Sequence, residues 1–410
     1  FVILKFVVGA RKNFFFEFGS KNNDFLKIKG KEKEGKWFAS ANHQNKHLDG
    51  RERGNWRNYI SMCIKISRAV RRMHAAGLAH SDLSYKNVLV DPSTGDACLI
   101  DLDGLVVPGK FPPDVVGTPD FIAPEVMSTM KLSKDNPGRA LPKRETDQHA
   151  LSVLIYMYLL YRHPLRGRKI HDADPLRDEE LSMGERALFI EHPTDVQNRP
   201  NPRDARPGDL PWADVEQRPY SIAGPYLKEL FEKAFISGLH NPAERPSADN
   251  WERALVKTID LMQPCSNPQC EQKWYVFDNT KSPSCPFCGT RFAGQLPILN
   301  LYSSRGKGKF TADQHRLMVY SDQYLYEWHS NRLVFPNERL RDDQKKPVGY
   351  FKLHHGRWVF VNQRLPQMKI VGDNPKDIAV NQMVELTEGQ QILFSPENGG
   401  RLAQVQLVQA

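Results

Sequence analysis

The chain has 410 residues, of which 40% are hydrophobic and 26% are charged, a composition typical of a folded globular protein and not of a disordered or fibrous one. It contains no apolar run of about 18 residues, and its first residues lack the basic lead and cleavage site of a secretory signal. We therefore expect no membrane partner and a reducing, cytoplasmic environment.

The formal net charge is +9, and it is concentrated near the beginning of the chain. Residues 1–60 contain 13 Lys and Arg against 6 Asp and Glu. Such a surplus would suit an acidic partner, but no aromatic residues are interleaved with the basic ones. We therefore expect a solvated loop here and no binding of nucleic acid.

The first predicted elements in chain order are two strands, Phe1–Val8 and Asn13–Phe18, followed by a polar loop to residue 55. A long amphipathic helix is predicted from Trp56 to Ala76, because apolar residues recur there every three or four positions. Gly77 follows as the expected helix cap.

Two short strands are then predicted, Asn87–Val90 and Ala97–Ile100, and the turn 91–95 joins them. Further predicted helices are Asp147–Tyr161, Pro225–Ser237 and Ala248–Met262. From Leu296 onward, short strands separated by turn residues predict a small β-sandwich or barrel. These strands are Leu317–Tyr320, Tyr324–Trp328, Gly349–Leu353, Trp358–Asn362, Lys369–Val371, Met383–Leu386, Gln391–Phe394 and Gln404–Val408.

Three polar residues are placed where they can perform phosphoryl transfer. Asp82 and Asn87 lie five residues apart on one tight loop between the long helix and a strand, so their side chains can face one site. An aspartate there can accept a proton from a hydroxyl group, and an asparagine can hold a metal ion. Asp101 ends the apolar strand that follows and would supply a second metal ligand.

Five segments resemble, in the same order, motifs of the eukaryotic-like (Hanks-type) bacterial serine/threonine protein kinases. Together they span about residues 60–260. They are the H-R-D-L-x-x-x-N-like loop His80–Asn87, the D-F-G-like Asp101–Asp103, the activation-segment end Gly117–Glu125 with its A-P-E, the Asp147 at the start of an apolar helix, and Asn241–Ser247 with its Arg245.

This resemblance implies that the cofactors are ATP and Mg²⁺, and it gives roles to four residues. Asp82 would be the catalytic base, and Asn87 and Asp101 would hold magnesium. Lys86 would contact the transferred phosphate, although most members carry that lysine at the position of Ser84.

The resemblance also implies roles for four residues outside the loop. Thr118 corresponds to the threonine that hydrogen-bonds the base in serine/threonine kinases, which favours a Ser or Thr acceptor on a protein substrate. Asp147 would brace the backbone of the catalytic loop, and Arg245 would pair with Glu125.

One departure from the family pattern is that Ser81 stands where most members have arginine. That arginine usually binds a phosphate on the activation segment. Residues 105–115 contain no Ser, Thr or Tyr, so neither the phosphate nor its partner is present. We hypothesise that the segment is ordered without phosphorylation.

Another departure is that no Gly-rich loop, strand lysine or partner glutamate precedes the long helix, so most of an N-lobe is missing. Either the protein begins upstream of residue 1, or the chain is a degenerate kinase. Retention of Asp82, Asn87 and Asp101 favours the first hypothesis. The alternative function is a pseudokinase scaffold that binds proteins without phosphotransfer, and a small-molecule phosphotransferase is disfavoured by the A-P-E segment.

Four of the six cysteines cluster, with the spacing C-x4-C and C-x2-C, and predict a structural zinc ribbon. Two disulfides or free thiols are the alternative. Cys63 and Cys98 stand alone in apolar segments and are expected to be buried. The predicted ligands are Cys265, Cys270, Cys285 and Cys288.

The predicted fold class is therefore α+β, in three parts: a mostly helical kinase-like C-lobe (1–262), the four-cysteine zinc ribbon (263–293) and an all-β sandwich (296–410). Val384–Phe394 resembles the closing hairpin of forkhead-associated sandwiches, but the residues that read phosphothreonine there cannot be placed, so a structural or docking sandwich stays open. The architecture is similar to that of kinases in tellurite-resistance-like gene clusters, which implies a von Willebrand A-type protein and a metal-dependent phosphatase as partners.

Overall fold

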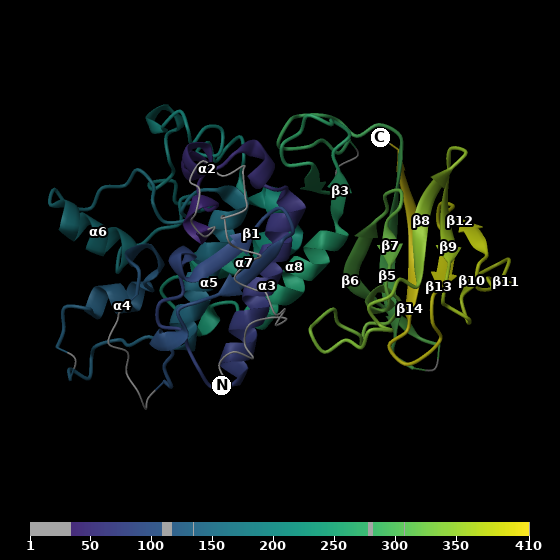
Figure 1. The fold of residues 1–410 in the computed structure, drawn as a ribbon, viewed down its shortest axis with the longest axis horizontal. Helices are drawn as coiled ribbons and strands as arrows, with labels where there is room; N and C mark the ends of the chain where they lie inside the picture. Colours follow the sequence, from purple (N-terminus) through teal and green to yellow (C-terminus); the bar gives the residue numbers. More distant parts are fainter. Residues whose placement is uncertain (1–33, 109–116, 134, 278–281, 307, 410) are drawn as a thin grey trace. The chain divides into compact units, whose positions relative to one another are not determined.

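The computed structural model describes residues 34–108, 117–133, 135–277, 282–306 and 308–409 (Figure 1). It divides into two compact units, Phe1–Leu255 and Val256–Ala410. The predicted strands Phe1–Val8 and Asn13–Phe18 lie outside the described residues. Among the helices in the described ranges, none combines the length and the apolar character that crossing a membrane requires.

The first unit contains the predicted amphipathic helix as α3, Trp56–Ala75. It begins where the side chain of Asn55 accepts a hydrogen bond from the backbone N of Asn58, a side-chain N-cap. It ends before Gly77, which has a φ of +85° that a residue with a side chain rarely adopts. These local signals explain why both ends lie within one residue of the prediction.

Helix α5, Arg144–Leu160, is the centre of this unit. Nearly all its side chains are buried, as expected of a helix that is apolar on every side. The indole Nε1 of Trp56 donates a hydrogen bond to the carbonyl oxygen of Leu159, 3.0 Å away, and so fixes α3 against α5. The helix begins three residues earlier than predicted, because the Thr146 hydroxyl accepts a hydrogen bond from the Lys143 amide, 2.9 Å away, and donates one to the Lys143 carbonyl oxygen, 2.7 Å away.

Strands β1 (Val88–Asp91) and β2 (Asp96–Leu99) form the predicted antiparallel hairpin, each within one residue of its expected bounds. The turn between them closes through a hydrogen bond from the Gly95 amide to the Asp91 carbonyl, 2.8 Å away. The hairpin therefore delivers residue 87 at its entrance and residue 100 at its exit to the same end of the ladder.

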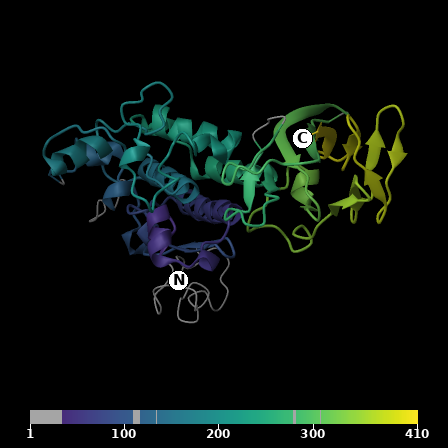
Figure 2. The ribbon, with the colours of Figure 1, turned by 90° about the horizontal axis from the view of Figure 1, so that it is seen from above.

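The other helices that the structure describes are shorter than α3 and α5, and Figure 2 shows the ribbon from above. The predicted helix Pro225–Ser237 changes at Lys233 into a π-helical turn. The predicted helix that begins at Ala248 ends at Asp260, two residues early, because Met262 pairs in a strand instead. Apart from α3, α5 and the short α9 of the second unit, the described α-helices are α2 (Ala41–His47), α4 (Pro124–Thr129), α6 (Pro175–Met183), α7 (Pro225–Glu232) and α8 (Ala248–Asp260).

The second unit contains a small hairpin and two larger sheets that share one apolar core. The hairpin is β3 (Met262–Pro264) with β4 (Trp274–Val276). One sheet has the order β11-β10-β13-β14-β5-β6 and the other β12-β9-β8-β7. The strands are β5 (Gln295–Ser304), β6 (Phe310–Met318), β7 (Tyr324–Leu325), β8 (Gly349–His354), β9 (Arg357–Asn362), β10 (Lys369–Val371), β11 (Lys376–Asp377), β12 (Met383–Glu385), β13 (Gln391–Leu393) and β14 (Arg401–Gln409).

Several parts of this unit differ from the prediction. The hairpin β3–β4 and strands β5 and β11 were not predicted, and β6 begins at Phe310, seven residues before the predicted Leu317. Strand β5 pairs with β14 from Gln295 to Ser303. The predicted strand Tyr324–Trp328 stops at Leu325 and continues as the helical turn α9, Glu327–Ser330. The cause is His329, whose Nδ1 accepts a hydrogen bond from the Tyr326 amide, 3.0 Å away, and so folds the chain back on itself.

Candidate active site

The loop between α3 and β1 is held in place by a buried carboxylate on α5. Asp147 is 2% exposed, and its Oδ2 accepts a hydrogen bond from the backbone N of His80 at 2.8 Å. The Nε2 of His74, on α3, lies 2.9 Å from the same oxygen. One carboxylate at the start of α5 therefore ties the loop to both central helices.

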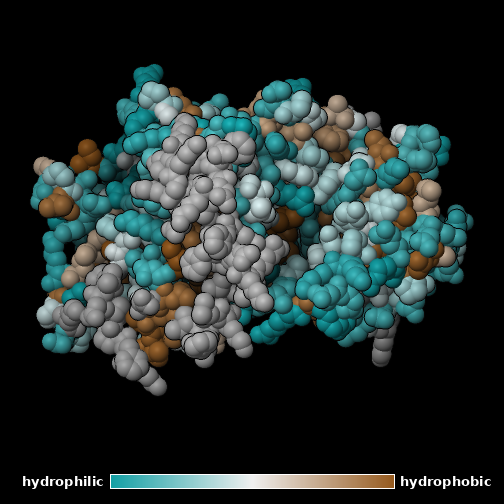
Figure 3. All heavy atoms as spheres, viewed as in Figure 1, coloured by the Kyte–Doolittle hydropathy of each residue, from teal (hydrophilic) through white to brown (hydrophobic). Residues whose placement is uncertain are grey.

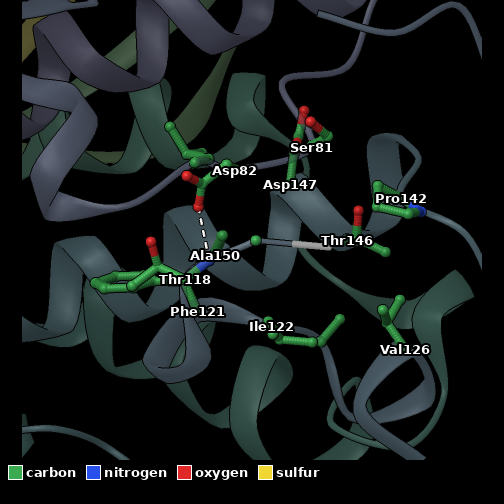
Figure 4. Close-up of a pocket in the computed structure, with 13 residues that line it drawn as sticks. Ser81, Asp82, Thr118, Phe121, Ile122, Val126, Pro142, Thr146, Asp147 and Ala150 are labelled. Carbon is green, nitrogen blue, oxygen red and sulfur yellow. Dashed lines mark hydrogen bonds between the residues drawn. The ribbon is translucent and has the colours of Figure 1, made fainter. Parts of the chain in front are cut away.

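Asp82 and Asn87, which were predicted from their spacing, are in direct contact. The Nδ2 of Asn87 donates to Asp82 Oδ2 at 3.1 Å and to the Asp82 carbonyl oxygen at 2.8 Å. The other carboxylate oxygen, Oδ1, accepts a hydrogen bond of 2.7 Å from the backbone N of Thr118 (Figure 4). The carboxylate is thus held in one orientation by a side chain of its own loop and by a segment 36 residues away.

Asp101 follows β2 by two residues in the chain. The amide of Ile100 donates to the Asn87 carbonyl oxygen at 3.0 Å, so Asp101 directly follows a residue that is bonded to the loop. Asp101 is exposed and has a φ of +58°, in the left-handed region. A non-glycine residue held in that region often marks a functional constraint.

Lys86 lies on the 3-10 turn Tyr85–Asn87, four residues after Asp82 in the chain. Its side chain is exposed and forms no ion pair with another described residue. The amide of Lys86 donates to Ser84 Oγ at 3.3 Å, so the turn is capped by the residue that replaces the expected lysine.

The segment that begins at Gly117 packs against the loop. Gly117 has a φ of +112°, and a Cβ atom there would come within 3.2 Å of the Ser81 carbonyl oxygen, so a larger residue would push the segment away. The hydroxyl of Thr118 donates to Ser84 Oγ at 3.3 Å. The family resemblance implied that Thr118 hydrogen-bonds the base; in the structure its backbone amide makes that bond, and its side chain binds Ser84.

Asp120 extends this segment into a charged cluster that the sequence analysis missed. Its carboxylate accepts hydrogen bonds from the hydroxyl of Tyr85 at 3.2 Å and from Nε of Arg166 at 2.7 Å. Burial raises the pKa of Asp120, but His163 and Arg166 outweigh burial and hold that pKa below its usual value. Burial, with Asp120, raises the pKa of Tyr85 to about 12.

His163 supports Asp120 from the end of α5. Its Nε2 lies 2.9 Å from the Asp120 carbonyl oxygen, and its Nδ1 accepts a hydrogen bond from the Leu165 amide. Burial lowers the pKa of His163 to about 4, so the ring is neutral and donates from Nε2. No sequence pattern pointed to this contact, because it joins residues 43 positions apart.

Arg245 and Glu125, predicted as a pair, form a bidentate ion pair. Nη1 and Nη2 of Arg245 lie 2.8 Å and 2.7 Å from the two carboxylate oxygens. The arginine side chain is 1% exposed and also donates to the carbonyl oxygens of Gly238, Leu239 and Glu145. A buried guanidinium with this many partners fixes α4 to the start of α5.

A small, open pocket lies between the loop, the 117–123 segment and α5 (Figure 4). Asp82 lines it from one side, and the apolar side chains of Ile122 and Val126 line it from another. Ser81, Thr146 and other polar residues complete its walls. The pocket thus combines a fixed carboxylate with an apolar wall.

The four clustered cysteines of the second unit form a group that can hold a metal ion. Their sulfur atoms all lie within 4.8 Å of one another. The Sγ atoms of Cys265 and Cys288 are 3.5 Å apart, and those of Cys270 and Cys285 are 3.7 Å apart, too far for a disulfide bond. Ligands 2.3 Å from a tetrahedral zinc would be about 3.8 Å from one another.

Comparison with known proteins shows the family of the first unit. A family model described as the protein kinase domain matches residues 38–251. The serine/threonine-protein kinase PknD of Chlamydia abortus is 30% identical over 141 residues, which cover 28% of this chain and 14% of that protein. The death-associated protein kinase dapk-1 of Caenorhabditis elegans is 34% identical over 107 residues, which cover 25% of this chain and 7% of that protein.

Among solved structures, the kinase domain of a rhoptry antigen of Toxoplasma gondii aligns over 49% of this chain and 46% of its own, at 15% identity. The TM-score of this alignment is 0.31. The matched segments of the curated relatives lie within much longer proteins, of which this chain spans less than a sixth.

Proposed function

Because the chain belongs to the protein kinase family, we propose that it transfers the γ-phosphate of ATP to serine or threonine hydroxyls of a protein substrate. The observation that carries this proposal is the contact of Asp82 with both Asn87 and the Thr118 amide. The similarity to a Chlamydia protein named as a serine/threonine-protein kinase supports the hydroxyl acceptor.

Asp82 acts in this proposal as the base that receives the proton of the substrate hydroxyl. Each of its carboxylate oxygens already accepts one hydrogen bond, and each retains a second lone pair for the substrate. The two bonds also fix the carboxylate, so that it need not reorient when the hydroxyl arrives.

Asn87 and Asp101 are the proposed magnesium ligands. Asn87 uses its Nδ2 for Asp82, which leaves its amide oxygen available to a hard cation. Asp101 is exposed at the adjoining strand end. When bound, Mg²⁺ neutralises negative charge on the phosphates of ATP. Lys86, an exposed cation on the same turn, would contact the transferred phosphate.

The segment from Thr118 to Glu125 is the proposed platform for the protein substrate. It is held at one end by Asp82 and at the other by Arg245, so its backbone stays in place beside the pocket. A polypeptide that lies on this segment brings its hydroxyl to Asp82, which is why we propose a protein acceptor.

The test of this function is phosphate transfer from radiolabelled ATP to a Ser- and Thr-containing protein, measured with the complete protein. Asp82→Asn is expected to reduce transfer by about 10²–10⁴-fold, the usual contribution of a general base. The control, Asp135→Asn, changes an exposed aspartate and should leave transfer unchanged. Absence of transfer by the complete protein would contradict the proposal and favour a protein-binding pseudokinase, and equal transfer by the complete protein and Asp82→Asn would contradict the role of Asp82 as the base.

We further propose that the activation segment works without a phosphate. Ser81, which replaces the phosphate-binding arginine, donates a hydrogen bond of 2.7 Å to the Gly104 carbonyl oxygen and so supports the start of the segment. Residues 109–116 lie outside the described residues. Phosphatase treatment should leave the transfer rate unchanged; a phosphate on Thr118 that raised the rate would argue against this regulation.

For the second unit we propose a structural zinc ion bound by the four cysteines, a ribbon at about residues 263–293, and a forkhead-associated-like sandwich from residue 296. The sulfur separations and the donor set of four thiols support zinc in a closed site. The resemblance to kinases of tellurite-resistance-like gene clusters extends the proposal to a von Willebrand A-type protein and a metal-dependent phosphatase as partners, in a bacterial cytoplasm.

A further inference from the structure

The solvent-facing side of the sheet β12-β9-β8-β7 carries more apolar surface than a sheet face in water needs. Most of the surface in Figure 3 is hydrophilic, and its hydrophobic residues lie in small groups. The outer face of an antiparallel sheet is normally polar. Here Tyr324 is 51% exposed and Met383 is 59% exposed.

The register of the sheet places these side chains in one row across four strands. Tyr324 of β7 pairs with Tyr350 of β8, Tyr350 pairs with Val361 of β9, and Val361 pairs with Met383 of β12. The rings of Tyr324 and Tyr350 are 6.4 Å apart. The alternate residues of the same strands, such as Phe351, Phe360 and Val384, fill the core, so the row faces away from it.

A second row, two residues further along the strands, carries opposite charges at its two ends. Lys352 of β8 pairs with Val359 of β9, which pairs with Glu385 of β12. Lys352 and Glu385 are exposed, and they lie on opposite sides of β9. Glu385 also forms an ion pair with Arg357, in which Oε2 lies 3.2 Å from Nη1 of the arginine, and the arginine side chain is 71% exposed. An exposed pair of this kind is weak and can rearrange.

We propose that the chain self-associates through this face, with a second copy of the same chain as the partner. The two copies are related by a two-fold axis that is parallel to β9 and lies midway between the two facing sheets. This rotation places β8 of one copy over β12 of the other. Two such layers pack about 10 Å apart, as the sheets of a sandwich do.

This arrangement makes the part of the face on β12, β9 and β8 complementary to itself, whereas β7 with Tyr324 extends beyond β12 of the second copy. Tyr350 meets Met383 of the second copy, an aromatic–sulfur contact, and Val361 meets its own equivalent. Lys352 meets Glu385 of the second copy, and the reverse pair forms at the same time. Arg357 approaches its own equivalent at the strand end, where its ion pair with Glu385 offsets the repulsion.

Reversing the charge of Lys352 or of Glu385 in the full chain tests the proposed dimer. Sedimentation velocity at micromolar concentrations should show a reversible dimer. Lys352→Glu and Glu385→Lys should each weaken dimerisation by about tenfold or more, because each creates two like-charge contacts. An equimolar mixture of the two variants should dimerise again, since every contact in the mixed dimer joins opposite charges.

Placing a charge in the apolar row, which contains Tyr350, Val361 and Met383, tests the same dimer independently. Met383→Asp should abolish the dimer, whereas Leu353→Asp changes a residue that is 47% exposed but lies on the opposite side of β8 and should leave it intact. All four changed residues are exposed, and thermal unfolding would verify that each variant folds. A chain that stays monomeric, or single charge variants that dimerise as tightly as the parent chain, would overturn the proposal and leave the face to a different partner.

Discussion

The loop that carries Asp82 and the turn that carries Cys285 are held in place by different kinds of contact. The loop depends on side chains and amides from distant segments, at Asp147 and Thr118. The turn closes on itself, because the Gly289 amide donates to the Cys285 carbonyl oxygen and the Cys285 amide donates to that of Thr290. The geometry of the Asp82 loop therefore depends on the folding of the whole first unit. The geometry of the Cys285 turn needs only a short sequence and a ligand that joins its thiols.

The largest expected effect is on the cysteine turn. Joint Cys285→Ser and Cys288→Ser substitution removes two of four thiols, and structural zinc contributes about 10–16 kcal/mol of apparent binding energy in small zinc domains. We expect zinc to be lost and residues 265–292 to become sensitive to protease. Elemental analysis should find one zinc ion per parent chain, and the control Cys98→Ala should retain it; a parent chain without zinc would contradict the assignment.

The next largest effect is expected at Arg245, on which the distant contacts of the first unit depend. Arg245→Met leaves the Glu125 carboxylate without its buried partner and should lower the free energy of unfolding by about 3–5 kcal/mol. The matched control, Arg253→Met, removes an exposed pair with Asp249 and should cost about 0.5 kcal/mol or less. Similar losses in both variants, measured by denaturant unfolding, would show that burial of the pair is unimportant.

A smaller effect follows from the pKa of His163. The ring has a pKa of about 4 in the folded chain and about 6.5 when unfolded, so the unfolded state binds its proton first as the pH falls. This contribution to stability is fully present above pH 6.5 and decreases toward pH 4; it should fall by about 2 kcal/mol between pH 6.5 and 5. His163→Gln should flatten the pH dependence of the unfolding free energy over that range. If the slope of that free energy against pH were the same in the variant, the low pKa of His163 would not be its cause.

The smallest effect is expected at Thr118. Its side chain makes one hydrogen bond of 3.3 Å to Ser84, so Thr118→Ala should cost about 1 kcal/mol or less and reduce phosphate transfer less than tenfold. Asp82 would keep its bond to the amide of residue 118. Thr118→Pro removes that amide and is the matched contrast; if both variants lost activity equally, the side chain would matter more than the backbone.

The elements that could be predicted from the sequence are those with local causes. Helix α3 has a periodic apolar face, an Asn55 cap and a terminating Gly77, and the spacing of Asp82 and Asn87 on one loop anticipated their contact. The four cysteines were found from their spacing alone.

The elements that escaped prediction have distant causes. Strand β5 contains Pro297 and Asn300, which interrupt the strand pattern, and it is ordered by pairing with β14, about a hundred residues later. The turn α9 depends on His329, whose Nε2 lies 3.1 Å from the buried carboxylate of Asp260. The cluster of Asp120, His163 and Arg166 joins segments that carry no common pattern in the sequence.

Arg245 also has a consequence for how the first unit moves. Its guanidinium binds Glu125 on α4, the Glu145 carbonyl in the first turn of α5, and the carbonyls of Gly238 and Leu239 after α7. Each of these segments is held to the same buried guanidinium by one or two hydrogen bonds. Their backbone amides should therefore exchange with solvent as one cooperative block, and the platform beside Asp82 should open only when that block opens.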